Sequence, residues 1–209
     1  MSWTMHPLKE DEGKLEKEVR KVITEAYEKN IIMFCAVDDG RPAKDESFPG
    51  SICPSQVIRI GAADKAGNAW EFTPGHSDYI LPGLKIKAEY GKEDDSRRPL
   101  TGSSVAAALA AGLGGLILYC VQMSAILAYK DPQRALLDIK EYKALRGSFQ
   151  KMKDAFRNIG TNLESGSTFI RVWELFDLAA EKINSSRNSN DDKCLELAQL
   201  GRDIVRHTQ

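Results

Sequence analysis

The sequence has few residues of the kinds that build metal centres. Its four cysteines form no C-x-x-C pair; they are Cys35, Cys53, Cys120 and Cys194. Its three histidines lie far from the cysteines and from one another; they are His6, His76 and His207. This spacing argues against a zinc site, and we expect neither a metal nor another cofactor.

The chain also lacks an excess of charge of either sign. Its 209 residues include 29 basic and 30 acidic side chains, which gives a formal net charge of −1. Such a chain has no overall field that attracts nucleic acid or an anionic membrane, so we expect neither as a partner. The hydrophobic share of 42% and the charged share of 28% are those of an ordinary globular protein.

The first residues contain no apolar stretch of the secretory type. Residues 1–12 soon become densely charged, so no signal peptide is visible. Scattered cysteines without such a signal are typically reduced thiols. We therefore expect an intracellular, cytoplasmic location.

Helical and extended patterns alternate in the first half of the chain. Residues 12–30 have apolar positions at helical spacing, and residues 31–37 form a continuous apolar run that ends at Asp38-Asp39-Gly40. A second, shorter strand is predicted at residues 56–63, and another apolar piece, residues 79–81, ends at Pro82-Gly83. A helix followed by buried strands indicates an α/β fold with a mostly parallel sheet.

Residues 105–128 contain no charge. Their length satisfies the criterion of about 20 apolar residues for a membrane span. Ten of these 24 residues are nevertheless alanine or glycine, which offer little apolar area for transfer into lipid. We therefore expect a helix buried in the protein and packed through its small residues, with a membrane anchor as the alternative.

The remainder of the chain is charged and helical. Pro132 suits a helix start, another helix is predicted to begin at residues 169–176, and a last amphipathic helix covers residues 194–205. No cluster of catalytic type occurs there. We predict a domain at residues 1–130 and an α-helical extension at residues 131–209.

One pair of hydroxyl groups has an unusual setting. Ser103 and Ser104 follow Gly102 and directly precede the uncharged helix. Backbone N–H groups and the positive end of the helix dipole can stabilise a developing oxyanion there. A serine at this position can equally well be a helix cap.

The surrounding motifs resemble those of the subtilisin-like serine proteases. Residues 102–112 resemble the family's serine motif, G-[TS]-S-x-A-x-x-x-x-A-G. Upstream, residues 48–50 resemble its aromatic-Pro-Gly turn, residues 57–62 its "V-I-x-V-G-A" strand, and residues 78–83 its "D-[VI]-x-A-P-G" element. This resemblance covers residues 1–129 and implies a partial three-layer domain of that family.

The resemblance implies particular roles for five residues. Ser104 would be the nucleophile of a serine endopeptidase, with its own backbone N–H in the oxyanion hole. Asp38 stands where the family has an asparagine donor, and an ionised carboxylate cannot donate; either Asp38 is protonated or the hole is weaker. Four residues after the nucleophile, where the family usually has a proline, this chain has Ala108, and a helix accepts alanine readily. Ser2 and Trp3 would line the substrate cleft.

The family's catalytic aspartate and histidine precede all these motifs in chain order. Neither His6 nor His76 stands in a suitable context, so the chain resembles the C-terminal half of the domain. We therefore expect a peptide or protein substrate, little activity of the chain alone, and the missing N-terminal half as a partner. The alternative is a non-catalytic, protein-binding module with the same fold, which the carboxylate of Asp38 favours.

Overall fold

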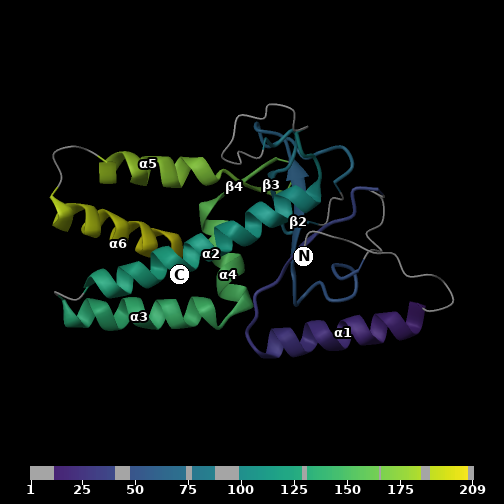
Figure 1. The fold of residues 1–209 in the computed structure, drawn as a ribbon, viewed down its shortest axis with the longest axis horizontal. Coiled ribbons are helices and arrows are strands. Elements are labelled where there is room, and N and C mark those ends of the chain that lie inside the picture. Colours follow the sequence, from purple (N-terminus) through teal and green to yellow (C-terminus); the bar gives the residue numbers. More distant parts are fainter. Residues whose placement is uncertain are drawn as a thin grey trace. The chain divides into compact units, whose positions relative to one another are not determined.

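The computed structural model describes most of the chain. The described ranges are residues 12–40, 48–73, 77–87, 99–128, 131–164, 166–184 and 189–206. They contain six helices and five strands in a mixed α/β arrangement (Figure 1). The expected α/β class with a mostly parallel sheet is confirmed.

The chain divides into two compact units. The first comprises residues 1–111 and 162–170, and the second comprises residues 112–161 and 171–209. Each unit contains part of residues 131–209, the segment expected to be a helical extension. The predicted domain boundary at residue 130 stays a prediction.

A five-stranded sheet in the order β1-β2-β3-β5-β4 organises the first unit. Strands β1 (Phe34–Ala36), β2 (Ile58–Ala63) and β3 (Tyr79–Pro82) are mutually parallel neighbours, and β5 (Thr168–Ile170) is parallel to β3. Their side chains are almost all buried on both faces, which explains the continuous apolar runs in the sequence. The two strands predicted at residues 31–37 and 56–63 are confirmed as β1 and β2, although both are shorter than expected, and the apolar piece at residues 79–81 lies in β3.

Helix α1 (Glu12–Glu28) contributes to the core of the first unit through its apolar stripe. Ile23 is buried in a cluster with Cys35 of β1 and Val57, and Leu15 and Val19 pack against that cluster. The amphipathic helix predicted at residues 12–30 is therefore confirmed.

The expectation that a helix begins at Phe169 is wrong. Residues 168–170 form β5, and helix α5 (Val172–Asn184) begins only after it. Phe169 is fully buried against Ala63 and Ile80. A strand of three residues is too short to show a period, so its apolar pair was indistinguishable from a helix start. Strand β4 (Gly160–Asn162), at the sheet's edge, was not expected either.

Helix α2 (Ser103–Leu127) is the long uncharged helix, drawn in teal in Figure 1. By length and composition it could cross a membrane, and 44% of its most apolar window is buried within the structure. The expectation of a buried helix packed through its small residues therefore holds for one face of α2 only, because the other face is exposed.

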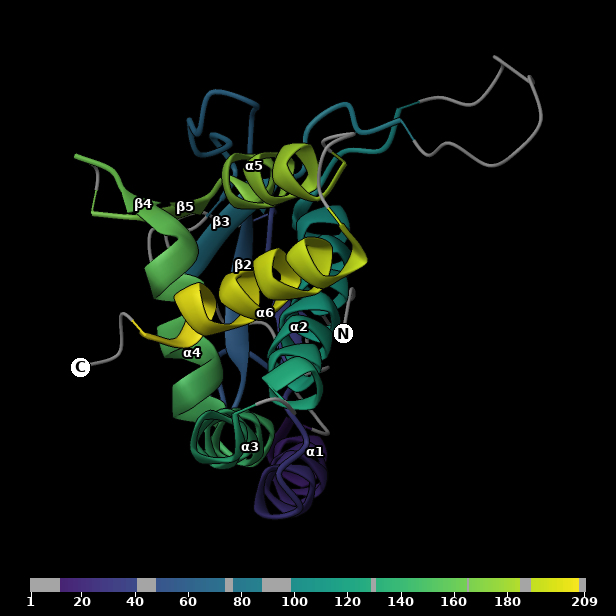
Figure 2. The same ribbon diagram turned by 90° about the vertical axis from the view of Figure 1, so that its left-hand side faces the viewer.

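The second unit is mostly helical in its described part, with Gly160 and Thr161 of β4 at its boundary. Beside the end of α2 it contains α3 (Pro132–Arg146), α4 (Phe149–Ile159), α5 and α6 (Asn190–Arg206). Helix α4 packs against both α3 and α6, and α5 packs against α6, as Figures 1 and 2 both show. Phe156 and Met152 of α4 and Ile204 of α6 are among its fully buried side chains.

Candidate functional site at the start of helix α2

The start of α2 is hydrogen-bonded to residues at or beyond the ends of three parallel strands. Asp39 follows β1, Ala62 lies near the end of β2, and Gly83 follows β3. Their partners on the helix side are Gly102 and Ser103. The carboxyl ends of parallel strands are where open α/β sheets bind ligands.

Ser103 is held by its backbone and by its side chain. Its N–H donates to Oδ2 of Asp39 at 2.7 Å, and its hydroxyl donates to Oδ1 of Asp39 at 2.5 Å. The Ser103 hydroxyl also accepts the N–H of Ala62 at 3.0 Å. Asp39 thus caps α2 from a different element, and Ser103, which is fully buried, has a structural role.

Two glycines allow the helix start to approach the sheet. The N–H of Gly102 donates to the carbonyl of Gly83 at 2.8 Å. A Cβ at Gly83 would lie 2.7 Å from Cβ of Ala62 and 2.9 Å from the carbonyl oxygen of Gly102. Gly102 has a φ of +142°, which side-chain-bearing residues rarely adopt. Both positions therefore require glycine.

Ser104 is the serine that stays accessible. It is half-buried, and no hydrogen bond joins its hydroxyl to another residue in the described part of the chain. A Cβ at Gly102 would lie 3.4 Å from Oγ of Ser104 and 3.3 Å from Oδ2 of Asp39, so both oxygens border that glycine. The role of Ser104 as a nucleophile stays a prediction.

Asp38 lies directly beyond β1 and is buried, with 7% of its surface exposed. Its Oδ1 accepts the N–H of Gly40 at 2.9 Å, which closes the turn after the strand. Its predicted place in an oxyanion hole stays a prediction. Asp39, which sequence reasoning treated only as part of a turn, is the residue that contacts the helix; a carboxylate directly after a buried strand was the available signal.

Burial is the main influence on the Asp39 carboxyl. It raises the pKa of Asp39 above the ordinary value, the hydrogen bonds from Ser103 oppose this shift, and the charge of Asp38 adds to it. A raised pKa means that the folded state binds the proton more tightly than the unfolded state does. The stability contributed by protonated Asp39 is therefore present below the ordinary aspartate pKa of about 4 and is lost as the pH rises through the raised pKa.

We expect Asp39→Asn to remove this loss of stability with rising pH. The amide oxygen can still accept the Ser103 N–H, and the side chain no longer titrates. Urea unfolding of wild type and variant at several values between pH 4 and pH 7 measures the difference. A difference in unfolding free energy that does not change with pH would contradict the assignment.

The other predicted site residues lie elsewhere. Ser2, Trp3, His6, His76 and His207 all fall outside the described residues. Within the described ranges, no group of three or more histidine, cysteine or acidic residues could hold a metal ion.

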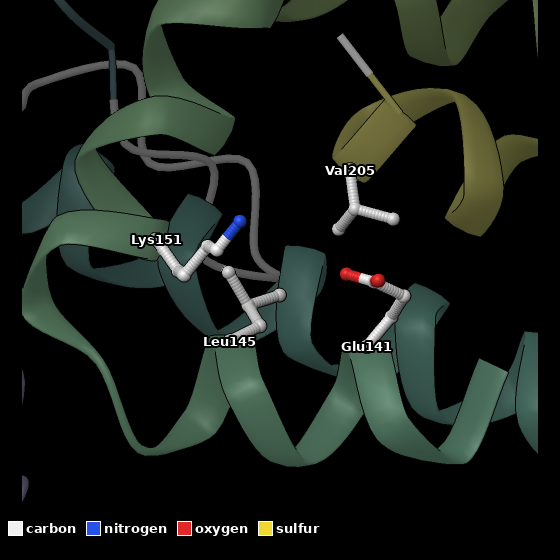
Figure 3. Close-up of a pocket in the computed structure, with 4 residues that line it drawn as sticks. All are labelled: Glu141, Leu145, Lys151 and Val205. Atoms are coloured by element: carbon white, nitrogen blue, oxygen red, sulfur yellow. The ribbon is translucent and has the colours of Figure 1, made fainter. Parts of the chain in front are cut away.

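A small hollow in the second unit is a poor candidate for a substrate site. It is lined by Glu141 and Leu145 of α3, Lys151 of α4 and Val205 of α6, as Figure 3 shows. It has room for about one water molecule. We therefore place the candidate site at the start of α2.

Two solved structures resemble the chain in fold. A lanthipeptide protease matches with a TM-score of 0.54 and 14% identity, over 85% of this chain and 60% of that one. The prenylagaramide maturation protease PagA matches with a TM-score of 0.49 and 19% identity, over 91% of this chain and 55% of that one. The chain thus spans less than two thirds of either structure. No protein-family model and no curated protein matches it.

These comparisons correct the family prediction made from the motifs. No family model matches, and the two structures are described as a lanthipeptide protease and a prenylagaramide maturation protease, without the name of the subtilisin-like serine proteases. A TM-score of 0.54 at 14% identity shows a fold shared with the lanthipeptide protease and nothing beyond the fold. We therefore withdraw both the subtilisin-like assignment and the serine-endopeptidase function inferred from it.

Proposed function

We propose that the chain is part of a peptide-bond hydrolase and receives an extended peptide at the start of α2. The fold shared with a lanthipeptide protease supports the substrate class. The observation that carries the proposal is the accessible Ser104 at a helix N-terminus, beside the carboxyl ends of β1, β2 and β3. A peptide carbonyl is a suitable ligand for this position, because backbone N–H groups and the helix dipole favour negative charge there.

The surrounding residues suit a binding role. Asp39 and Ser103 fix the first turn of the helix, so a peptide would meet a preorganised hydroxyl at Ser104. Such preorganisation increases binding affinity, because no entropy is lost in ordering the site when the peptide binds. Because the chain spans 60% of the lanthipeptide protease, we propose that further catalytic groups come from protein outside this chain.

A second candidate is a peptide-binding module that cleaves nothing. Asp38 favours it, because a carboxyl group stands where an amide donor would be expected, and a carboxylate oxygen accepts hydrogen bonds but donates none. Both candidates place the peptide at Ser104 and differ in whether a bond is broken.

Binding and cleavage of fluorescein-labelled casein peptides test the proposal. We expect the full chain to bind them and Ser104→Ala to weaken binding about fivefold, which corresponds to one lost hydrogen bond of about 1 kcal/mol. Ser55→Ala, which alters an exposed serine in the first unit, is the matched control and should leave binding unchanged.

Cleavage separates the two candidates. A hydrolase releases smaller labelled fragments, and Ser104→Ala lowers that rate at least as far as it weakens binding, because the peptide is held at this position. Binding without fragments supports the non-catalytic module. If folded wild-type protein neither binds nor cleaves, or if Ser55→Ala has the same effect as Ser104→Ala, the proposed site is wrong.

A further inference from the structure

Two aromatic side chains lie in the loop that follows β2, at the same edge of the sheet as the start of α2. Trp70 and Phe72 stack edge to face, with ring centroids 5.1 Å apart and an interplanar angle of 78°. Trp70 is half-buried and Phe72 is 42% exposed, so neither ring is packed in the core. A single exposed apolar residue is common on a protein surface, but two stacked rings at a strand end form an apolar contact surface.

This loop is fixed to a strand residue that also holds the start of α2. The N–H of Trp70 donates to the carbonyl of Ala62 at 2.9 Å, and the N–H of Thr73 donates to the carbonyl of Trp70 at 2.7 Å. The hydroxyl of Thr73 donates to the same Ala62 carbonyl at 3.1 Å. These three bonds close a turn around the aromatic pair and attach it to β2.

The N–H of Ala62 joins the loop to the serine pair. This nitrogen lies 3.2 Å from the hydroxyl oxygen of Thr73 and 3.0 Å from that of Ser103. Ser104 follows Ser103 directly, and all of these residues belong to the first unit. An extended peptide carries successive side chains about 3.3 Å apart along its length. A peptide that runs from Ser104 toward the end of β2 therefore brings one of its next few side chains to the aromatic pair.

We infer that Trp70 and Phe72 form a subsite for an aromatic side chain of the bound peptide. The inference rests on the proposed function, because it needs a peptide at Ser104. It names the substrate class: peptides with phenylalanine, tyrosine or tryptophan within a few residues of the carbonyl at Ser104. Aromatic rings gain from edge-to-face and offset contacts with other rings, in addition to the area that they bury. Because the turn already holds the pair, little entropy is lost in ordering it.

A lysine side chain is the competing occupant. Glu71, which lies between the two aromatic residues in the sequence, is exposed, and a cation is attracted both by a carboxylate and by the face of an aromatic ring. We favour the aromatic side chain, because an exposed ion pair with Glu71 contributes little, whereas the apolar surface of Phe72 gains from burial against an apolar partner.

A scan of peptide sequence tests the subsite. A set of fluorescein-labelled hexapeptides places one phenylalanine at each position in turn of an alanine background, and the all-alanine hexapeptide is the reference. We expect the best phenylalanine position to raise affinity at least about tenfold over the reference, as measured by fluorescence anisotropy with the full chain. Lysine at that position should raise it by less.

Substitutions assign this preference to the aromatic pair. We expect Phe72→Ala to reduce the preference to about twofold, because the exposed half of the subsite is lost. Tyr27→Ala is the matched control: it removes an aromatic residue of α1 that is 38% exposed, and it should keep the full preference. Ser104→Ala should weaken all the peptides by one common factor. Since the preference is a ratio of two affinities of one protein, partial unfolding of a variant does not alter it.

Tryptophan fluorescence locates the bound side chain. The sequence contains three tryptophans, so Trp3→Phe/Trp173→Phe leaves Trp70 as the only one. We expect 4-nitrophenylalanine at the best peptide position to quench most of the Trp70 emission, because the nitrophenyl group quenches at short range. The same group at the position with the weakest preference should quench much less. Trp70→Phe in otherwise wild-type protein should remove most of the quenching by the first peptide.

The outcomes distinguish this inference from the proposed function. If the peptides bind and Ser104→Ala weakens them, but no phenylalanine position is preferred or Phe72→Ala leaves the preference intact, the subsite is wrong and the proposed function stands. A preference for lysine over phenylalanine also overturns the subsite, as does binding of the nitrophenyl peptide without quenching of Trp70. If folded wild-type protein binds none of the peptides, both the subsite and the proposed function are wrong.

Discussion

Replacing Gly201 with alanine is expected to destabilise the protein, although the same replacement at Gly112 is expected to stabilise it. Gly201 lies in α6 against the backbone of α2. A Cβ there would overlap the carbonyl oxygen of Cys120 and lie 2.9 Å from its carbonyl carbon and 3.1 Å from Cβ of Ser124. A helix carbonyl cannot turn away without breaking its own hydrogen bond, so α6 would have to move.

We expect Gly201→Ala to lower the free energy of unfolding by about 1–3 kcal/mol, the usual cost of overpacking. Gly112→Ala meets open space and gains helix propensity of about 1 kcal/mol. Urea denaturation of the two variants and wild type measures both free energies of unfolding. Equal effects of the two substitutions would show that α6 does not pack on α2 through Gly201.

Removing the carboxylate of Asp138 should lower the free energy of unfolding by more than Gly201→Ala does. Asp138 of α3 is buried, and its Oδ2 accepts a hydrogen bond from Arg202 of α6 at 3.3 Å. Arg134 lies 3.7 Å from the other oxygen. The Arg202 side chain is only 13% exposed, so without Asp138 a guanidinium would stay largely buried without its counter-charge.

We expect Asp138→Ala to cost about 3–5 kcal/mol, as for other broken buried ion pairs. The double variant Asp138→Leu/Arg202→Met should recover most of this loss, because two apolar side chains replace both charges. Chemical denaturation of wild type, single variant and double variant forms the test. A double variant as unstable as Asp138→Ala would mean that packing around Asp138, and not the buried charge, determines the effect.

The sequence predicted those elements whose period and length distinguish them. Helix α1 and strand β2 were recognised because each combines a clear apolar pattern with a turn at its end, and the apolar piece noted at residues 79–81 lies in β3. Strands β4 and β5 were missed, because each has three residues and depends on tertiary pairing. Helix α2 was recognised, but composition alone did not reveal that only one of its faces is covered.

The candidate site was predictable in part. A glycine followed by two serines before a long helix correctly indicated a helix start, and the structure places it at the ends of the parallel strands. The contribution of Asp39 required the fold, since it is 64 residues from Ser103. Asp38 and Asp39 are adjacent in the sequence, and only the structure shows which of them contacts the helix.

The attachment of α2 to three strand ends affects how natural variation at this site can be interpreted. Gly83 and Gly102 leave no room for a side chain, and Asp39 and Ser103 hold the helix start together, so selection for a folded protein maintains all four whether or not the protein has an activity. Ser104 makes no such contact. Among related sequences, an invariant glycine or first serine would therefore indicate only an inherited fold, whereas retention or loss of the second serine would distinguish lineages that use the site from those that do not.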